Sequence, residues 1–304
     1  MRVLSPTSLA DACAMMATDN SAAPTPIAGG TDLLVHWPGN LAAHDKTYLD
    51  LSHLAELHVT RWTDTHLELG ALATYWDTIR DAAITQHFPL LISAARTVGA
   101  IQIQSRGTWA GNIINASPAA DGVPALMALD ASIVLVSTHT PGMSESSSES
   151  RGYPNESQFA AASLHRQEIR LDEFYLGYKQ MRKRSDQLIE KIRIPRRPAR
   201  LHIFEKVGAR RAQAITKVGA AIIHTEETGW RIVAHSVAPT VRRCRAVESL
   251  LESNQPIKSP LDLAPALNQD ISPIDDIRST AAYRERVLAR ILYFALRGVA
   301  TGVS

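Results

Sequence analysis

The chain has 304 residues, of which 45% are hydrophobic and 20% are charged, and its formal net charge at pH 7 is +2. This composition is that of a globular protein of about two domains, and it gives no reason to expect nucleic acid or an anionic membrane as the main partner. No apolar run approaches the ~20 residues that a membrane span needs, and no signal-peptide hydrophobic run opens the sequence. We therefore expect a cytoplasmic protein.

The cysteine count excludes several kinds of site. Cys13 and Cys244 are the only two cysteines in the sequence. An iron–sulfur cluster usually takes four thiolates, and a disulfide framework or a structural zinc site of the cysteine type needs more than two. The eleven histidines are scattered without the spacing of a zinc-enzyme motif, so we expect no metal on this chain.

The first part of the sequence predicts alternating helices and short strands. A helix capped near Ser8 places apolar residues on one face, namely Leu9, Ala12, Cys13 and Met16. Residues 25–35 read as a strand and a tight turn at Gly29 and Gly30, followed by an element whose first N–H groups are free to bind phosphate. Further along we expect strands at 47–51 and 66–71, a polar link at 60–65, helices at 75–86 and 90–96, and a helix followed by a buried strand within 125–136.

Residues 97–121 stand out because they contain little charge and many small side chains. Gly99, Gly107 and Gly111 and the side-chain amides of Gln102, Gln104 and Asn112 precede a closing Ser-Pro-Ala-Ala-Asp. Glycine permits close approach of the backbone, and small polar groups beside it supply hydrogen bonds. We expect this stretch to wrap an extended polar ligand.

The second part of the sequence predicts an antiparallel sheet followed by helices. Residues 137–167 are rich in serine and read as an exposed, flexible insertion without secondary structure of its own. Strands are expected at 188–195, 201–207, 215–224 and 230–237, with a hairpin turn at Gly229, and helices at 246–253, 261–268 and 281–299. A basic cluster reads as a solvated face or a subunit contact rather than a nucleic-acid site; it comprises Arg182, Lys183, Arg184, Arg196, Arg197 and Arg200.

Four motifs carry a resemblance when they are taken together. They are Ala-Gly-Gly-Thr-Asp-Leu at 28–33, Gln-Ile-Gln-Ser-Arg-Gly-Thr-Trp-Ala-Gly-Asn at 102–112, Asn-Ala-Ser-Pro-Ala-Ala-Asp at 115–121, and a strand that contains Lys206. In this combination the chain resembles, over nearly its whole length, the FAD-binding medium subunit of the molybdenum hydroxylases, the flavoprotein of the xanthine dehydrogenase and carbon monoxide dehydrogenase family. The resemblance implies an α+β protein: a two-subdomain FAD-binding domain of the vanillyl-alcohol-oxidase-like (PCMH) type at 1–177, then a smaller α+β domain at 178–304 with an antiparallel sheet and C-terminal helices.

The resemblance also implies which residues bind the cofactor. The glycine turn would wrap the pyrophosphate of FAD with main-chain N–H groups, and glycine there would let the phosphates approach the backbone. A second wall would bind phosphate or ribityl oxygens, an acidic residue a sugar hydroxyl, apolar residues the ring systems, and a lysine the reduced flavin. In this sequence these positions are Ala28, Gly29, Gly30, Thr31, Asp32, Leu33, Val98, Thr108, Gly111, Asn112, Asp121, Ile189 and Lys206.

The function implied is that of an oxidoreductase subunit with non-covalent FAD, which transfers electrons and has no catalytic side chain of its own. Molybdopterin and 2Fe–2S clusters would lie on a large and a small partner subunit, and NAD, quinone or oxygen would accept the electrons. Two alternatives stay open, a self-contained FAD-dependent oxidase or dehydrogenase and a flavin-free scaffold subunit.

Two details bear on these alternatives. Trp109 and Ala110 replace an isoleucine and a glycine of the family motif, so Ala110 is compatible only where the backbone does not need positive φ. Trp109 would pack in the core or shield the flavin, with the core preferred. Asp121 has a structural alternative, because it can cap a helix that begins at Val123 without touching a ligand.

Overall fold

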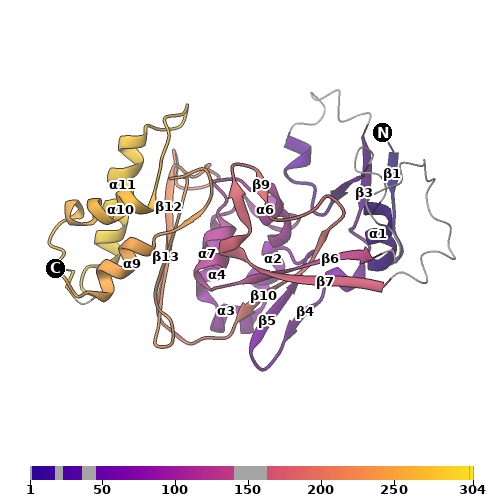
Figure 1. Cartoon of the computed structure of the whole chain (residues 1–304), viewed down its shortest axis with the longest axis horizontal. Helices are drawn as coiled ribbons and strands as arrows, with labels where there is room; N and C mark the ends of the chain where they lie inside the picture. Colours follow the sequence, from indigo (N-terminus) through magenta and orange to yellow (C-terminus); the bar gives the residue numbers. More distant parts are fainter. Residues whose placement is uncertain (1, 18–22, 36–45, 140–162, 301, 304) are drawn as a thin grey trace.

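The computed structural model describes residues 2–17, 23–35, 46–139, 163–300 and 302–303 of the chain (Figure 1). The N-terminal half holds a three-stranded sheet, a five-stranded sheet and a group of helices, and the C-terminal half adds a four-stranded sheet that is covered by helices at the end of the molecule. Within the described residues, no helix is long and apolar enough to cross a membrane.

A small parallel sheet begins the fold, with the strand order β1-β3-β2. Its strands are β1 (Arg2–Leu4), β2 (Thr25–Ile27) and β3 (Thr47–Asp50), and helix α1 (Leu9–Met16) follows the first of them. The Ser8 hydroxyl accepts a hydrogen bond from the N–H of Asp11, and the four residues expected on the apolar face of this helix are buried. The predicted cap and apolar face are confirmed.

A five-stranded antiparallel sheet forms the centre of the N-terminal half, in the order β4-β5-β10-β6-β7. Its strands are β4 (Thr60–Trp62), β5 (His66–Gly70), β6 (Ser132–His139), β7 (Ser163–Arg170) and β10 (Leu188–Pro195). The polar link expected at 60–65 is wrong in part, because β4 adds there as an edge strand. The insertion expected at 137–167 is wrong at both ends, where β6 and β7 pair; residues 140–162 lie outside the described residues.

β10 lies in the middle of this sheet, so the sheet extends beyond residue 177. The division of the chain into domains at that residue stays a prediction.

Six short helices pack beside this sheet. They are α2 (Tyr75–Arg80), α3 (Ala82–His87), α4 (Pro89–Thr97), α5 (Ile101–Gln104), α6 (Trp109–Asn115) and α7 (Gly122–Ala128). The single helix expected at 75–86 is two helices, because Asp81 adopts an extended backbone (ψ 114°) and its carboxylate accepts a hydrogen bond from the N–H of Ile84. Aspartate favours such a cap over a helix interior.

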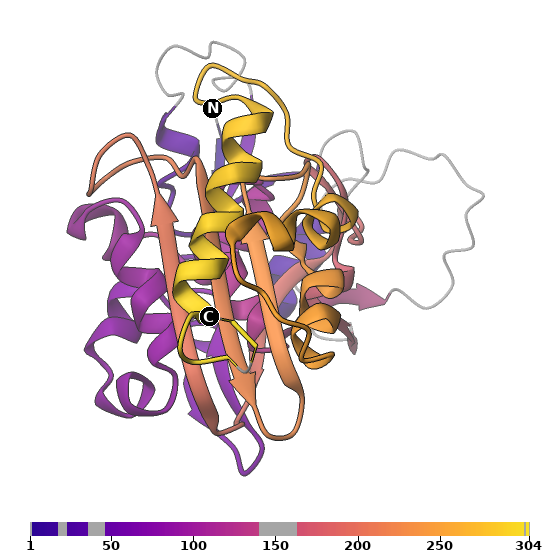
Figure 2. The ribbon, with the colours of Figure 1, turned by 90° about the vertical axis from the view of Figure 1, so that its left-hand side faces the viewer.

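The C-terminal half is built on an antiparallel sheet in the order β11-β12-β13-β14. The strands are β11 (Ala199–Val207), β12 (Val218–Thr225), β13 (Gly229–His235) and β14 (Arg242–Arg243), and Gly229 turns the predicted hairpin with φ +68°. Helices α9 (Arg245–Glu252), α10 (Ala264–Asp270) and α11 (Ala281–Leu296) cover one face, as the long helix in Figure 2 shows. Short elements complete the described chain: η1 (Leu33–Val35), η3 (Ala55–Leu57), η4 (Leu171–Glu173), η5 (Pro260–Leu263), β8 (Tyr175–Gly177) and β9 (Gln180–Met181).

Alternate residues of this sheet face two different cores. Ala220, Ile222 and Ile232 pack with the C-terminal helices, whereas Ala221 and Val233 belong to the core of the N-terminal half. A strand buried on both faces in this way joins the two halves of the molecule through its side chains.

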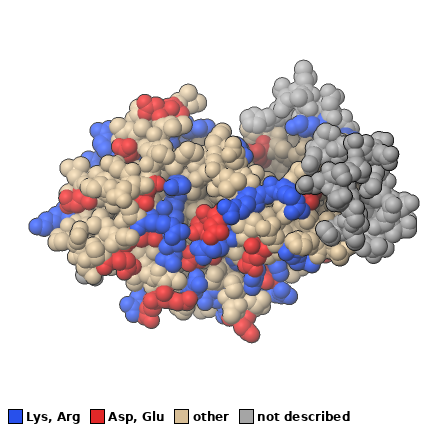
Figure 3. Space-filling view, in the orientation of Figure 1, with Lys and Arg blue, Asp and Glu red and all other residues tan. Residues whose placement is uncertain are grey.

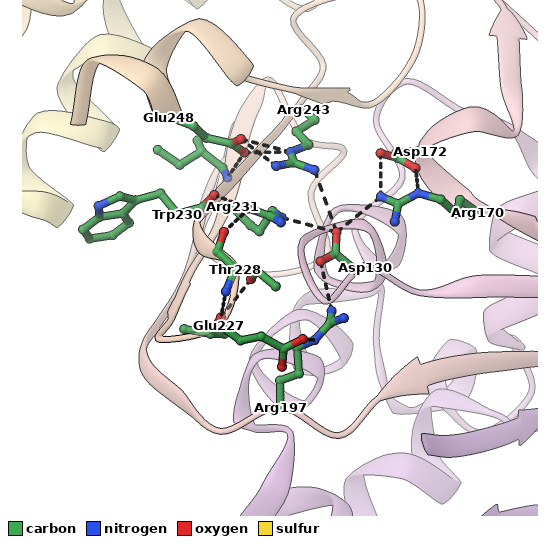
Figure 4. A network of polar contacts seen from close by, with 12 residues as sticks. Asp130, Arg170, Asp172, Arg197, Glu227, Thr228, Trp230, Arg231, Arg243 and Glu248 are labelled. Atoms are coloured by element: carbon green, nitrogen blue, oxygen red, sulfur yellow. Dashed lines mark hydrogen bonds and ion pairs between the residues drawn. The ribbon is translucent and has the colours of Figure 1, made fainter. Parts of the chain in front are cut away.

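An ion-pair network also spans the two halves, with the Asp130 carboxylate at its centre (Figure 4). Its oxygens lie 3.1 to 3.8 Å from nitrogen atoms of four arginines, namely Arg170, Arg197, Arg231 and Arg243. The Asp130 side chain is only 8% exposed. Because β7, the segment after β10, β13 and β14 each supply one guanidinium, the network links both sheets.

Basic side chains on the face shown in Figure 3 form a band in which acidic side chains are interspersed. Members of the predicted basic cluster are paired: the Arg184 guanidinium lies 2.9 Å from the Asp186 carboxylate, and that of Arg197 lies 3.1 Å from the Glu227 carboxylate. Ion pairing of this kind favours the expected solvated face over a nucleic-acid site.

Candidate functional site

The turn after β2 offers main-chain donors. In the part of the chain that the structure describes, the N–H groups of Gly29, Gly30, Thr31 and Asp32 have no hydrogen-bond partner. Gly30 has φ +71°, and its carbonyl accepts a hydrogen bond from the N–H of Leu34 at 3.0 Å. Several successive free N–H groups, with a left-handed residue among them, form the kind of concave turn that binds anions. Leu33 is 37% exposed at the start of η1.

This turn lies directly against the second glycine-rich segment. A Cβ placed on Gly29 would come 1.7 Å from the main-chain oxygen of Arg106, and the Arg106 Nε donates to the Gly29 carbonyl at 3.4 Å. The Asn115 side chain donates to the Asp32 carboxylate at 2.9 Å. The two segments are therefore in contact with each other, and their roles toward FAD stay predictions. The reason for Gly29 differs from the expected one, because its missing side chain admits another stretch of backbone.

Helix α6 forms the second segment. The Thr108 hydroxyl caps it by accepting from the N–H of Gly111 at 2.9 Å. The Asn112 carbonyl oxygen accepts from the N–H of Gly122 at 3.2 Å, and its NH₂ group has no partner among the described residues. An unpaired amide donor at this position suits an oxygen-rich ligand.

The two unusual residues of this segment fit the helix. Trp109 is fully buried, its indole N–H donates to the Thr78 hydroxyl at 2.8 Å, and its ring centroid lies 4.6 Å from that of Tyr75. The core position expected for Trp109 is confirmed. Ala110 lies inside α6 and is not among the residues with positive φ, so alanine is compatible with the backbone there.

Asp121 is the centre of a buried polar cluster at the junction of the two halves. Its carboxylate accepts from Lys206 Nζ at 2.6 Å and from the Thr216 hydroxyl at 2.5 Å. Lys206 also donates to the Thr97 carbonyl at 2.9 Å, and the side chains of Asp121 and Lys206 are each 12% exposed. The helix cap expected in the structural alternative is wrong, because the Asp121 side chain makes no cap hydrogen bond to α7; contact of Asp121 with a ligand stays a prediction. The carboxylate of Asp121 instead accepts a hydrogen bond from the Lys206 ammonium group, which is distant in the sequence.

The two residues expected beside the ring systems occupy different places: Val98 lies next to this cluster and Ile189 lies in the core. Val98 directly follows Thr97 at the end of α4, and its carbonyl accepts from the Gln104 side chain at 3.0 Å. Ile189 is 5% exposed in β10 and packs in the main core, so it presents little free surface. The roles of both residues toward FAD stay predictions.

Sequence reasoning missed several residues of this region. Arg106 and Asn115 tie the two glycine segments together. Thr216, which precedes β12, and His235 of β13 lie beside Asp121. Arg106 and Asn115 belong to the sequence motifs, so their polar side chains were a signal that could have identified them. His235 has no local signal, because only the pairing of β11, β12 and β13 places it near Asp121.

Comparison with protein families agrees with this arrangement. Residues 1–147 match the FAD binding domain in molybdopterin dehydrogenase, and residues 204–299 match the CO dehydrogenase flavoprotein C-terminal domain. Among solved structures, a carbon monoxide dehydrogenase from Hydrogenophaga pseudoflava superposes with a TM-score of 0.80 at 23% identity, covering 97% of this chain and 96% of that one. Quinoline 2-oxidoreductase from Pseudomonas putida 86 superposes with a TM-score of 0.75 at 18% identity over 97% and 96% of the two chains. These structures share the fold.

Curated relatives carry related names. The nicotinate dehydrogenase FAD-subunit of Eubacterium barkeri is 35% identical over 43% of this chain and 44% of its own length, so this match spans less than half of either protein. Caffeine dehydrogenase subunit beta of Pseudomonas sp. is 28% identical over 94% of this chain and 90% of that one. The carbon monoxide dehydrogenase medium chain of Hydrogenophaga pseudoflava is 24% identical over 96% and 94%.

Proposed function

We propose that this chain, which belongs to the family of FAD-binding medium subunits of molybdenum hydroxylases, binds one FAD non-covalently between its two glycine segments and transfers electrons within an oxidoreductase complex. The observation that carries the proposal is the pair of segments 28–32 and 106–115. They are held in contact by Gly29 and Asn115, and they carry main-chain and amide donors that nothing else in the described chain satisfies.

These groups fit a dinucleotide. A pyrophosphate has several anionic oxygens and no donor, so it complements the free main-chain N–H groups of the turn. The free amide of Asn112 adds a donor from the second segment. The Asp32 carboxylate is negatively charged and accepts a hydrogen bond from the Asn115 side-chain amide. Because that carboxylate is paired with Asn115, the neighbouring main-chain N–H groups are left for the ligand.

The residues of the chain bind and orient the cofactor. FAD supplies the ability to accept electrons singly and pass on a pair. Lys206, from the C-terminal sheet, is already paired with Asp121, so the cluster is close to neutral before any charge develops nearby. We infer no proton transfer to substrate on this chain.

Partners follow from what the chain lacks. Its two cysteines are both buried, in different core clusters, and each burial raises the thiol pKa, to about 12 for Cys13. We therefore propose that a small 2Fe–2S subunit delivers electrons and that a large molybdopterin subunit oxidises the substrate. This organisation accords with relatives named medium chain and medium subunit. NAD, quinone and oxygen are the acceptors to be compared.

Reconstitution tests the proposal. The full chain is purified, incubated with FAD and analysed for absorption spectrum and stoichiometry, and partners that co-purify are examined for mass, molybdenum and iron. We expect one FAD per chain and reduction of that FAD by the iron–sulfur partner. A colourless protein that cannot be loaded with FAD would leave only the scaffold function. Turnover of an organic substrate by the isolated chain would instead establish a self-contained oxidase.

A further inference from the structure

One buried histidine has no hydrogen-bond partner. His235, the last residue of β13, is 0% exposed, and neither of its ring nitrogens bonds to any group in the described residues. Buried polar side chains are hydrogen-bonded in the great majority of cases, so an unpaired imidazole in the interior needs an explanation. Its Nδ1 lies 4.0 Å from the Asp121 carboxylate, the nearest acidic group.

The sheet itself places this ring beside Asp121. Lys206 of β11 pairs with Gly219 of β12, and Gly219 pairs with His235 of β13, so the three form one row across three strands. Residues paired across a sheet project from the same face. That face carries the side chains of Ala221 and Val233 into the N-terminal core, so Lys206 and His235 both point toward α7.

Gly219 makes room for the imidazole. A Cβ on Gly219 would lie 2.1 Å from the His235 Nε2, so the ring occupies the place where a side chain of the central strand would stand. On the same sheet, the Phe204 ring centroid lies 6.0 Å from the imidazole. The ring is thus fixed from the sheet side, and its other nitrogen faces the carboxylate.

We propose that His235 is a positioning residue for the cofactor site: its uncharged imidazole orients the Asp121 carboxylate between Lys206 and Thr216 across the junction of the two halves. The inference rests on the proposed FAD function for its effect on the cofactor. The link runs through the main chain, since Gly122, next to Asp121, donates to Asn112 of the second wall. An N–H at His235 Nδ1 would hydrogen-bond the Asp121 carboxylate if the 4.0 Å distance between them shortened by about 1 Å, or if one water bridged them.

Charge explains why the ring must be neutral. Burial is the main cause that lowers the pKa of His235 to about 4, and Lys206 lowers it further while Asp121 opposes the shift. The Tyr75 hydroxyl is a further titratable group near Asp121, and burial raises its pKa well above the usual value. Arg284 donates to the Ser236 carbonyl from the helix side. A protonated His235 ring would place a second cation beside Lys206, and this cation would be shielded from water because the ring is fully buried.

The sign of the pH effect follows. The unfolded histidine binds a proton near pH 6.5 and the folded one near pH 4, so stability is complete above pH 6.5 and falls as the pH drops toward 4. Between pH 7.5 and pH 5 this one group shifts the folding equilibrium by about 30-fold. The same protonation pulls Asp121 away from Lys206 and weakens FAD binding.

Three variants of the full chain test the inference. H235Q keeps an amide donor but cannot titrate, H235L removes the donor, and H224Q is the matched control, a glutamine at another histidine of the same sheet. Thermal unfolding without FAD and the dissociation constant of FAD are measured from pH 7.5 to pH 5. We expect wild type and H224Q to lose stability and FAD affinity over this range more steeply than H235Q. We expect H235L to bind FAD about 10-fold more weakly than H235Q at pH 7.5.

The outcomes separate the two proposals. If the FAD-free unfolding profile of H235Q parallels that of wild type, the inference about His235 is wrong, whatever happens to FAD. If no variant, wild type included, binds FAD, the proposed function fails while the unfolding profiles still decide the role of His235. Where H235Q does not fold, the ¹⁵N ring signal of His235, assigned in the wild-type chain, gives the answer: titration of that signal near pH 6.5 would overturn the inference.

Discussion

Gly29→Ala is the change that tests the contact between the two glycine segments. The added Cβ would meet the Arg106 carbonyl oxygen at 1.7 Å, and the next nearest atom is the Arg106 carbonyl carbon at 2.5 Å. Both are main-chain atoms, so no side-chain rotation relieves the clash. The segments must separate by roughly 2 Å before these atoms reach ordinary contact distance. Overpacking of this kind costs about 1–3 kcal/mol of stability.

The same displacement should weaken FAD binding. A shift of this size breaks at least one hydrogen bond between the turn and an anionic oxygen, and such bonds contribute about 1.5–3 kcal/mol. We therefore expect the dissociation constant of FAD, measured by fluorescence quenching, to rise about 10- to 100-fold. Gly298→Ala is the control, because Gly298 has a left-handed backbone (φ +76°) but no atom within 4 Å of the added Cβ. The G298A variant should lose stability but keep the wild-type affinity for FAD. A G29A protein with wild-type stability and wild-type FAD affinity would refute the reasoning.

Three further predictions concern contacts inside the fold. D130N, which removes the charge facing four arginines, should lower the free energy of unfolding by about 3 kcal/mol, whereas E227Q, at a 67% exposed partner of Arg197, should change it by less than about 1 kcal/mol; equal effects in denaturant titrations would contradict the network. W109F should cost about 2–4 kcal/mol through the lost indole hydrogen bond and a cavity, with an unchanged spectrum of bound FAD; a spectral change at unchanged stability would show that Trp109 shields the flavin. K206M should destabilise the wild-type chain more than it destabilises the D121N chain, and an additive double-mutant cycle would argue against their pairing.

Local patterns in the sequence predicted the elements that local forces decide. The apolar spacing and the Ser8 cap define α1, and Gly229 defines the hairpin between β12 and β13. Trp109 in the core was also predictable, because a large aromatic side chain beside small residues favours burial. These features depend on residues within a few positions of one another.

Features that depend on distant partners were not predictable in this way. β4 is polar, but pairing with β5 makes it an edge strand, where a strand needs no continuous apolar face. In α11, Arg284 is 4% exposed, and its guanidinium donates to the Ser236 carbonyl and to the Asp276 carboxylate, which lie far from it in the sequence or in a separate loop. Leu288 and Leu292 are buried on the same helix.

Glycine shows where the two kinds of information meet. The sequence marks Gly29 as special, and the ordinary interpretation is that a ligand needs the space. In the structure, the Arg106 backbone occupies the space where a Cβ of residue 29 would lie. The His235 ring occupies the corresponding space at Gly219, a residue that belongs to no motif. In both places the missing Cβ lets two distant parts of the chain approach, and the groups brought together are those that would hold the cofactor. A substitution at either glycine therefore acts on FAD through the positions of Asn115 and Asp121, and Gly219→Ala should weaken FAD binding only while His235 is present.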